Sequence, residues 1–66
     1  MNKQLFRSIL ALHGYTQSKL SKEIGMSKNT MSAKVNGASP FSADQIILIC
    51  KTVGIEDSKT KCDIFL

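Results

Sequence analysis

The segment Thr16–Gly37, TQSKLSKEIGMSKNTMSAKVNG, constrains the fold of this chain more than any other part of the sequence. In each half of the segment two apolar residues are four positions apart: Leu20 with Ile24, and Met31 with Val35. This spacing places each pair on one face of a helix. Gly25 stands between the two halves, where a left-handed residue can end a helix without a steric penalty from Cβ. The segment therefore predicts two short amphipathic helices joined by a tight turn.

Capping residues mark the boundaries of these two helices. Thr16 and Ser27 each stand just before a predicted helix, where their hydroxyls can accept hydrogen bonds from free backbone N–H groups. Asn36-Gly37 is the stop signal for the second helix. We therefore expect helices over residues 17–24 and 28–36. Ser21, a small residue four positions before the glycine, is expected where the two helices come closest.

Three further helices are predicted around this pair. Residues 3–13 carry a broad apolar stripe: Leu5, Phe6, Ile9, Leu10 and Leu12. Ser42 and Gln45 have the spacing of a capping box, which opens a helix that runs to residue 53. A last helix is expected from residue 57 or 58 to the end of the chain. No segment alternates as a strand would, so the sequence predicts one all-α, five-helix domain over residues 1–66.

The charge is concentrated in the half that contains the paired helices. The chain has nine Lys and Arg residues against five Asp and Glu, a formal net charge of +4. Between Lys3 and Lys34 there are six basic residues and a single acid, Glu23. This local excess of positive charge favours an anionic partner such as nucleic acid.

Other classes of function are disfavoured by the composition. No apolar run approaches the roughly 20 residues of a membrane-spanning helix, and the first residues lack the pattern of a signal peptide. Cys50 and Cys62 form no CxxC pair and are accompanied by one histidine, so we expect no metal site and free thiols in a reducing cytoplasm. Without paired carboxylates or a glycine-rich phosphate loop, neither an enzyme, nor a cofactor, nor a small-molecule substrate is expected.

The outward face of helix 28–36 is the candidate reading surface. With Met31 and Val35 directed inward, five polar or small residues lie on or near that face: Lys28, Asn29, Thr30, Ser32 and Ala33. In paired helices of this kind the N-terminal part of the second helix meets base edges in the major groove. Asn29 can make a paired donor–acceptor contact with adenine, and Lys28 can donate to guanine O6 and N7. We therefore predict base-specific contacts from this helix.

A second group of residues is expected to hold backbone phosphates. The N-terminus of the first paired helix would face one phosphate, and the loop after the second helix would face another. The candidates are Thr16, Gln17, Lys19, Ser27, Lys34, Asn36 and Gly37. The two hydroxyl residues among them also serve as caps, and Asn36 is equally a turn former. Arg7 and Lys22 are weaker candidates, because spacing alone does not fix the direction in which they point.

These residues resemble the Cro/CI-type (XRE) helix-turn-helix family of phage and bacterial transcriptional regulators. The resemblance covers about Leu5–Val53, and its most specific part is Thr16-Gln17, Leu20-Ser21, Gly25, Met31 and Asn36-Gly37. The stretch KVNGASPFSADQIILICKTVGI is similar to a subgroup of small phage regulators of Gram-positive hosts. Two residues depart from the family pattern. Ser21 stands where alanine is usual, and Ala33 stands where longer polar side chains are common.

The resemblance implies a lambda-repressor-like domain that binds double-stranded operator DNA, commonly as a homodimer. It also implies a phosphate contact for Gln17 and base-reading positions for Lys28, Asn29 and Ala33. We therefore expect a sequence-specific transcriptional regulator, a Cro-like repressor of phage or prophage origin. The alternative is a protein-interaction module, such as an antitoxin or an anti-repressor partner, because one fold can serve either purpose.

Apolar residues near the C-terminus exceed what so small a core requires. They are Ile47, Leu48, Ile64, Phe65 and Leu66. Exposed apolar clusters are often interfaces, which favours a dimer built on these residues. The equally weighted alternative is that the last helix folds back and covers the helix that ends at residue 53.

Overall fold

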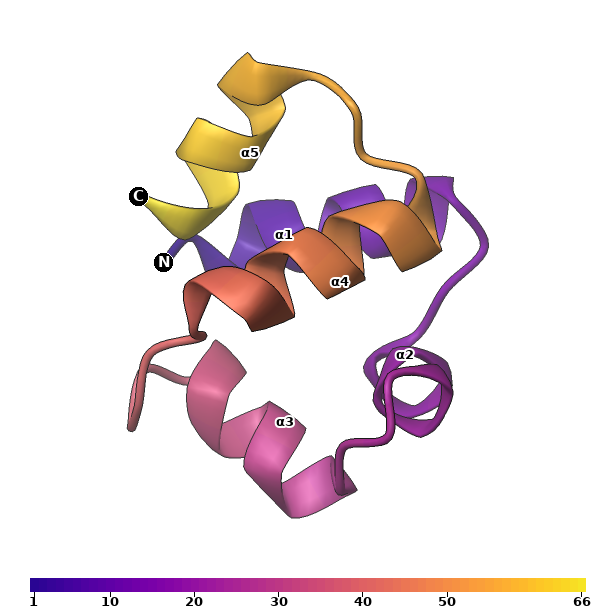
Figure 1. The fold of residues 1–66 in the computed structure, drawn as a ribbon, viewed down its shortest axis with the longest axis vertical. Coiled ribbons are helices and arrows are strands. Elements are labelled where there is room, and N and C mark those ends of the chain that lie inside the picture. Colours follow the sequence, from indigo (N-terminus) through magenta and orange to yellow (C-terminus); the bar gives the residue numbers. More distant parts are fainter.

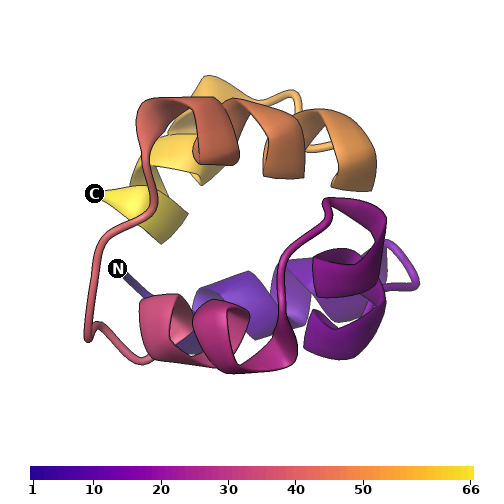
Figure 2. The ribbon, with the colours of Figure 1, turned by 60° about the horizontal axis from the view of Figure 1, so that its bottom comes forward.

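The computed structural model describes all 66 residues and contains five helices and no strand (Figure 1). The helices are α1 (Lys3–Leu12), α2 (Gln17–Glu23), α3 (Lys28–Val35), α4 (Ala43–Val53) and α5 (Ser58–Phe65). The predicted all-α fold is therefore confirmed, and the first three helices each end one residue earlier than expected. Figure 2 shows α1, α2 and α3 on one side, with α4 and α5 lying across them. None of the helices has both the length and the apolar character that a membrane span needs.

Side chains cap the helices where the sequence predicted. The hydroxyl of Thr16 accepts a hydrogen bond from the backbone N–H of Lys19 at 3.1 Å. At the start of α4 the capping box is complete. The Gln45 N–H donates to Ser42 Oγ at 3.1 Å, and the Ser42 N–H donates to Gln45 Oε1 at 2.9 Å. These bonds satisfy backbone donors that a helix leaves free at its start.

The turn between α2 and α3 depends on Gly25. Its φ is +74°, in the left-handed region where a residue with a side chain is strained. The chain reverses there, and the Met26 N–H donates to the carbonyl of Ser21 at 2.8 Å. This backbone bond closes α2 and directs the chain into α3 within a few residues.

The core is formed by all five helices and by Ile55, two residues after the end of α4. Its buried members are Phe6, Leu10, Leu20, Met31, Val35, Ile49, Cys50, Val53, Ile55 and Ile64. The helix pairs α2 with α3, α1 with α5, and α2 with α4 pack together. Leu12 was predicted to share the apolar stripe of α1, but its side chain is 77 % exposed. The stripe is narrower than the sequence suggested, because Phe6 and Leu10 form its buried centre.

The C-terminal helix corrects one part of the predicted dimer surface. Ile64 is fully buried, so it belongs to the core of the single chain and cannot face a partner. Phe65 is half-buried, and its ring lies 6.0 Å from the ring of Phe6 and 6.0 Å from that of Phe41, with edge-to-face geometry in both pairs. The last helix therefore folds back onto the chain, but it packs chiefly on α1 and not on α4, the helix that the alternative expected it to cover.

Candidate nucleic-acid interface

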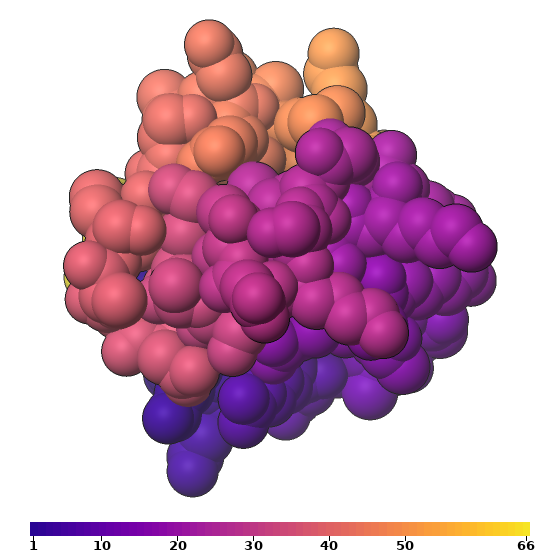
Figure 3. Space-filling view, turned by 90° about the horizontal axis from the view of Figure 1, so that it is seen from below, coloured from indigo at the N-terminus to yellow at the C-terminus, as the bar shows by residue number.

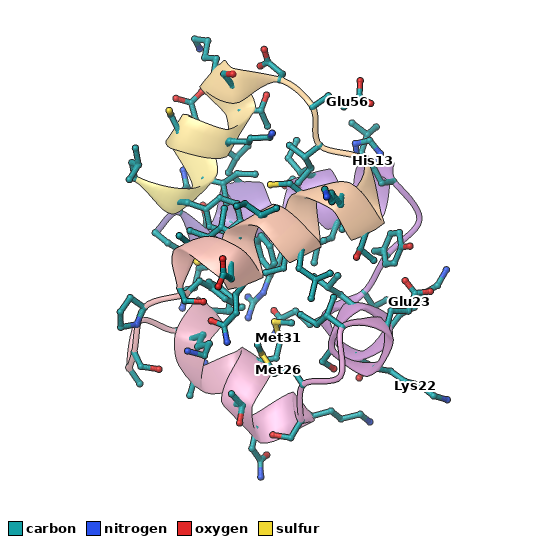
Figure 4. All side chains as sticks on the ribbon, viewed as in Figure 1. His13, Lys22, Glu23, Met26, Met31 and Glu56 are labelled. Atoms are coloured by element: carbon teal, nitrogen blue, oxygen red, sulfur yellow. The ribbon has the colours of Figure 1, made fainter.

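Helix α3 presents a polar outer face over a buried inner one. Met31 and Val35 are only 1 % and 2 % exposed, so they fix which side of the helix is directed inward. Figure 4 shows Met31 pointing into the space that α3 shares with the rest of the molecule. Four of the five predicted base-reading residues are exposed, namely Lys28, Asn29, Thr30 and Ser32, whereas Ala33 is half-buried. In Figure 3, α3 occupies the middle of the face seen from below.

Hydrogen bonds divide the residues of this face into occupied and free groups. Ser27 caps α3 by accepting from the Thr30 N–H at 3.1 Å, and its own hydroxyl donates to Thr30 Oγ1 at 2.9 Å. Asn36 Nδ2 donates to Ser32 Oγ at 3.3 Å. The side chains of Lys28 and Asn29, in contrast, make no hydrogen bond or ion pair within the chain. The first turn of α3 therefore offers one cationic and one amide side chain that are free to contact an external partner.

A hydrogen bond joins Arg7 of α1 to Gln17 at the start of α2, and the sequence spacing did not predict this contact. Arg7 of α1 donates from Nε to Oε1 of Gln17 at 2.8 Å. Helical spacing could not show where the Arg7 side chain points, because its partner lies ten residues away on another helix. Lys19 Nζ lies 4.7 Å from the centroid of the Tyr15 ring, a cation–π contact that holds this lysine near the end of α1. Figure 4 shows Lys22 pointing outward from α2.

Ser21, the small residue that the sequence placed where α2 and α3 come closest, is buried and shares a hollow with residues of α3. Ser21 is 1 % exposed, and its hydroxyl donates to the carbonyl of Ser18 at 2.9 Å, so the buried polar group is satisfied. Two shallow hollows open beside it, with volumes of about 180 Å³ and 620 Å³. Ser18, Ser21 and Lys28 line both hollows, Gln17 lines the smaller one, and Lys22 lines the larger one. These hollows bring polar side chains of α2 and α3 together at one surface.

In the last turn of α3 and in the loop that follows it, two candidate phosphate contacts, Lys34 and Gly37, are engaged within the chain. Lys34 Nζ donates to the carbonyl of Pro40 at 3.0 Å and lies 5.9 Å from the centroid of the Phe41 ring. The Gly37 N–H donates to the carbonyl of Lys34 at 3.2 Å. The loop after α3 is thus held against the helix, and Lys34 keeps two of its three N–H donors for an external anion.

None of the five acidic residues lies on α3, and three of them, Glu56, Asp57 and Asp63, follow α4 in the chain. One ion pair is present, Lys59 Nζ to Asp63 Oδ2 at 3.4 Å within α5. Glu56 lies with His13 at the corner where α1 meets the chain between α4 and α5 (Figure 4). No cluster of three or more His, Cys, Asp or Glu side chains could hold a metal ion. The arrangement therefore suits an anionic surface that approaches α2 and α3.

Comparison with known proteins agrees with this geometry. The family model of the Cro/C1-type HTH DNA-binding domain matches residues 6–56, well over half of the chain. Searches of curated proteins and of solved structures found no significant match. The matched residues begin in α1, contain α2, α3 and α4 whole, and end before α5. From the fold, the paired helices and this match together, the chain belongs to the Cro/C1-type helix-turn-helix DNA-binding domains.

Proposed function

We propose that this protein is a sequence-specific regulator of transcription, a Cro-like repressor of phage or prophage, which inserts α3 into the major groove of an operator. The single observation that carries the proposal is the first turn of α3, where the exposed Lys28 and Asn29 have no partner within the chain. An amide can pair with adenine and an ammonium with guanine, so this turn can distinguish base pairs.

The rest of the reading face has weaker hydrogen-bonding capacity. The hydroxyls of Ser32 and Thr30 already take part in bonds within the chain, and Ala33 offers only a methyl group. We therefore assign part of the sequence preference to methyl contacts with thymine and to DNA shape. Backbone phosphates would be held by the remaining predicted residues: Thr16, Gln17, Lys19, Ser27, Lys34, Asn36 and Gly37.

We further propose a homodimer formed by the outer face of α4. Ile47 and Leu48 are 54 % and 44 % exposed, and Ile47 lines a hollow of about 400 Å³ beside Ile55. Figure 3 shows α4 at the edge of the face that α3 occupies. A two-fold axis at this edge would place both α3 helices on one side of a duplex. Leu66, 96 % exposed, stays a weaker member of the same proposal.

Selection of bound sites from a pool of random duplexes tests the DNA-binding proposal. We expect an enriched sequence with two half-sites about one helical turn, ~34–36 Å, apart. Against that site, Lys28→Ala/Asn29→Ala should lose about 1–3 kcal/mol of discrimination for each base contact removed. Lys59→Ala is the matched control, because it removes the same charge from α5.

If the double variant keeps the full preference for the selected site, the assigned reading face is wrong. If no sequence is enriched and binding is weak at moderate salt, the protein-interaction module is favoured instead.

Sedimentation at micromolar concentration, with and without the selected duplex, tests the dimer. Leu48→Glu should shift the protein toward monomer and weaken operator binding. Leu12→Glu is the control, because it charges an exposed leucine on α1, outside the proposed interface. A monomer both with and without DNA would contradict the dimer and leave DNA binding by single copies.

A further inference from the structure

The side chains of Arg7 and Gln17 join α1 to the start of α2 by one hydrogen bond. Arg7 Nε and Gln17 Oε1 are 2.8 Å apart, and both residues lie at the surface. The guanidinium group has donors and no acceptor, so the atom of Gln17 that faces it must be the amide oxygen. The amide nitrogen of Gln17 is therefore turned away from Arg7. A free glutamine side chain can turn either its amide oxygen or its amide nitrogen outward, whereas the bond to Arg7 fixes the nitrogen as the outward group.

The joined pair now presents mainly donors, because one of the two lone pairs of the only acceptor, Gln17 Oε1, is occupied. The acceptor of Gln17 is engaged by Arg7, which leaves the two N–H groups of the amide and the terminal nitrogens of the guanidinium. Neither group has another hydrogen-bond partner, and no carboxylate forms an ion pair with Arg7. A site that consists of unengaged donors and carries one positive charge recognises an anion with several acceptor oxygens.

The position of the pair indicates which anion this is. Gln17 also lines the hollow of about 180 Å³ together with Lys28 and Ser32, which lie on α3. In Figure 3 the indigo N-terminal segment borders the face on which α2 and α3 lie. A duplex that enters at α3 would therefore bring its sugar–phosphate backbone past this hollow and toward the pair.

We infer that Arg7 and Gln17 act as one phosphodiester-binding unit, in which Arg7 fixes the Gln17 amide with its nitrogen outward and adds a charged contact from α1. The inference rests on the proposed DNA binding and extends it to a helix outside the helix-turn-helix. Arg7 is thus both a phosphate ligand and a positioning residue for Gln17. Loss of Arg7 therefore removes its own contact and also releases the Gln17 amide.

A double-mutant cycle on operator affinity tests this coupling. Arg7→Ala and Gln17→Ala should each weaken binding on the order of tenfold, as expected for hydrogen bonds to a charged group. Because Arg7→Ala already releases the Gln17 amide, the variant with both changes should be little weaker than Arg7→Ala alone. Arg7→Ala should also lower the slope of log affinity against log salt by about 0.9, the value for one phosphate neutralised on duplex DNA. Lys59→Ala controls for the change in net charge, and thermal unfolding of every variant checks that the fold is kept.

Gln17→Glu distinguishes a phosphate-binding unit from a merely structural bond. Glutamate keeps a partner for Arg7 but turns a second carboxylate oxygen outward in place of the amide nitrogen. We expect this variant to keep its folding stability and to bind the operator more weakly than Gln17→Ala does. The inference is overturned if wild type selects an operator while the two alanine effects multiply, or while Gln17→Glu binds as tightly as wild type. In those cases the proposed function stands. If wild type selects no DNA, both the function and this inference fail.

Discussion

Shortening Ile64 to valine tests whether the C-terminal helix completes the core of one chain. The side chain is fully buried, and valine removes one methylene group from it. Such a change in a packed core costs about 0.5–1.5 kcal/mol. For a domain of this size each kcal/mol corresponds to roughly 4–8 °C in Tm. Alanine would cost about 2–5 kcal/mol, which is comparable with the roughly 3–10 kcal/mol that 66 residues provide, so valine is the variant that stays folded.

Leu66 supplies the matched control two residues away. Its side chain is 96 % exposed, so Leu66→Ala should change stability by less than about 0.5 kcal/mol. Urea unfolding followed by circular dichroism, at two protein concentrations tenfold apart, measures both variants. For a contact within one chain, the loss caused by Ile64→Val is the same at both concentrations, whereas subunit contacts make stability depend on concentration. An equal loss for Leu66→Ala, or a loss for Ile64→Val that vanishes at the higher concentration, would refute the assignment of Ile64 to the core.

Three other measurements address local features. Burial raises the pKa of the Cys50 thiol, so a disulfide reagent should modify Cys62 within the folded protein and Cys50 only when the chain opens. Hydrogen bonds from the Thr60 hydroxyl and backbone N–H lower the pKa of Asp57, so its stabilising effect is present above the ordinary aspartate pKa and is lost as pH falls through the lowered value. Asp57→Asn should remove that part of the acid dependence seen in thermal unfolding. Gly25→Ala should cost about 1–2 kcal/mol, since the strain is in φ alone and no atom lies within 4 Å of the added Cβ.

Local chemistry explains which parts of the fold were predictable from the sequence. The caps at Thr16 and Ser27 and the turn at Gly25 are governed by residues close in the chain, so their types fix where α2 and α3 begin and end. Helical periodicity likewise identified Met31 and Val35 as buried, but Ala33, which it placed on the outer face of α3, is half-buried.

The remaining features depend on contacts between residues far apart in the sequence. Leu12 continues an apolar pattern, yet no other element covers it, and periodicity cannot show which part of a stripe a neighbour will bury. The sequence placed Ile64 in an exposed apolar cluster, whereas the packing of α5 on α1 buries its side chain. The bond between Arg7 and Gln17 joins two helices whose angle is set by the whole core. Long polar side chains have no periodic signal that identifies such partners.

The packing of α5 on α1 has a consequence for the order in which the molecule is made. The backbone N–H of Asn2, just before α1, donates to the carbonyl of Ile64 at 2.8 Å, so a backbone hydrogen bond joins residues 62 positions apart in this domain. During synthesis, the ring of Phe6 is not fully covered until α5 has been made and has packed on α1. The helix-turn-helix between them can form its own local bonds earlier, but the finished core depends on a contact of long sequence separation, which slows folding. A nascent chain that has not yet released α5 should therefore expose apolar surface and lack the stability that DNA binding requires.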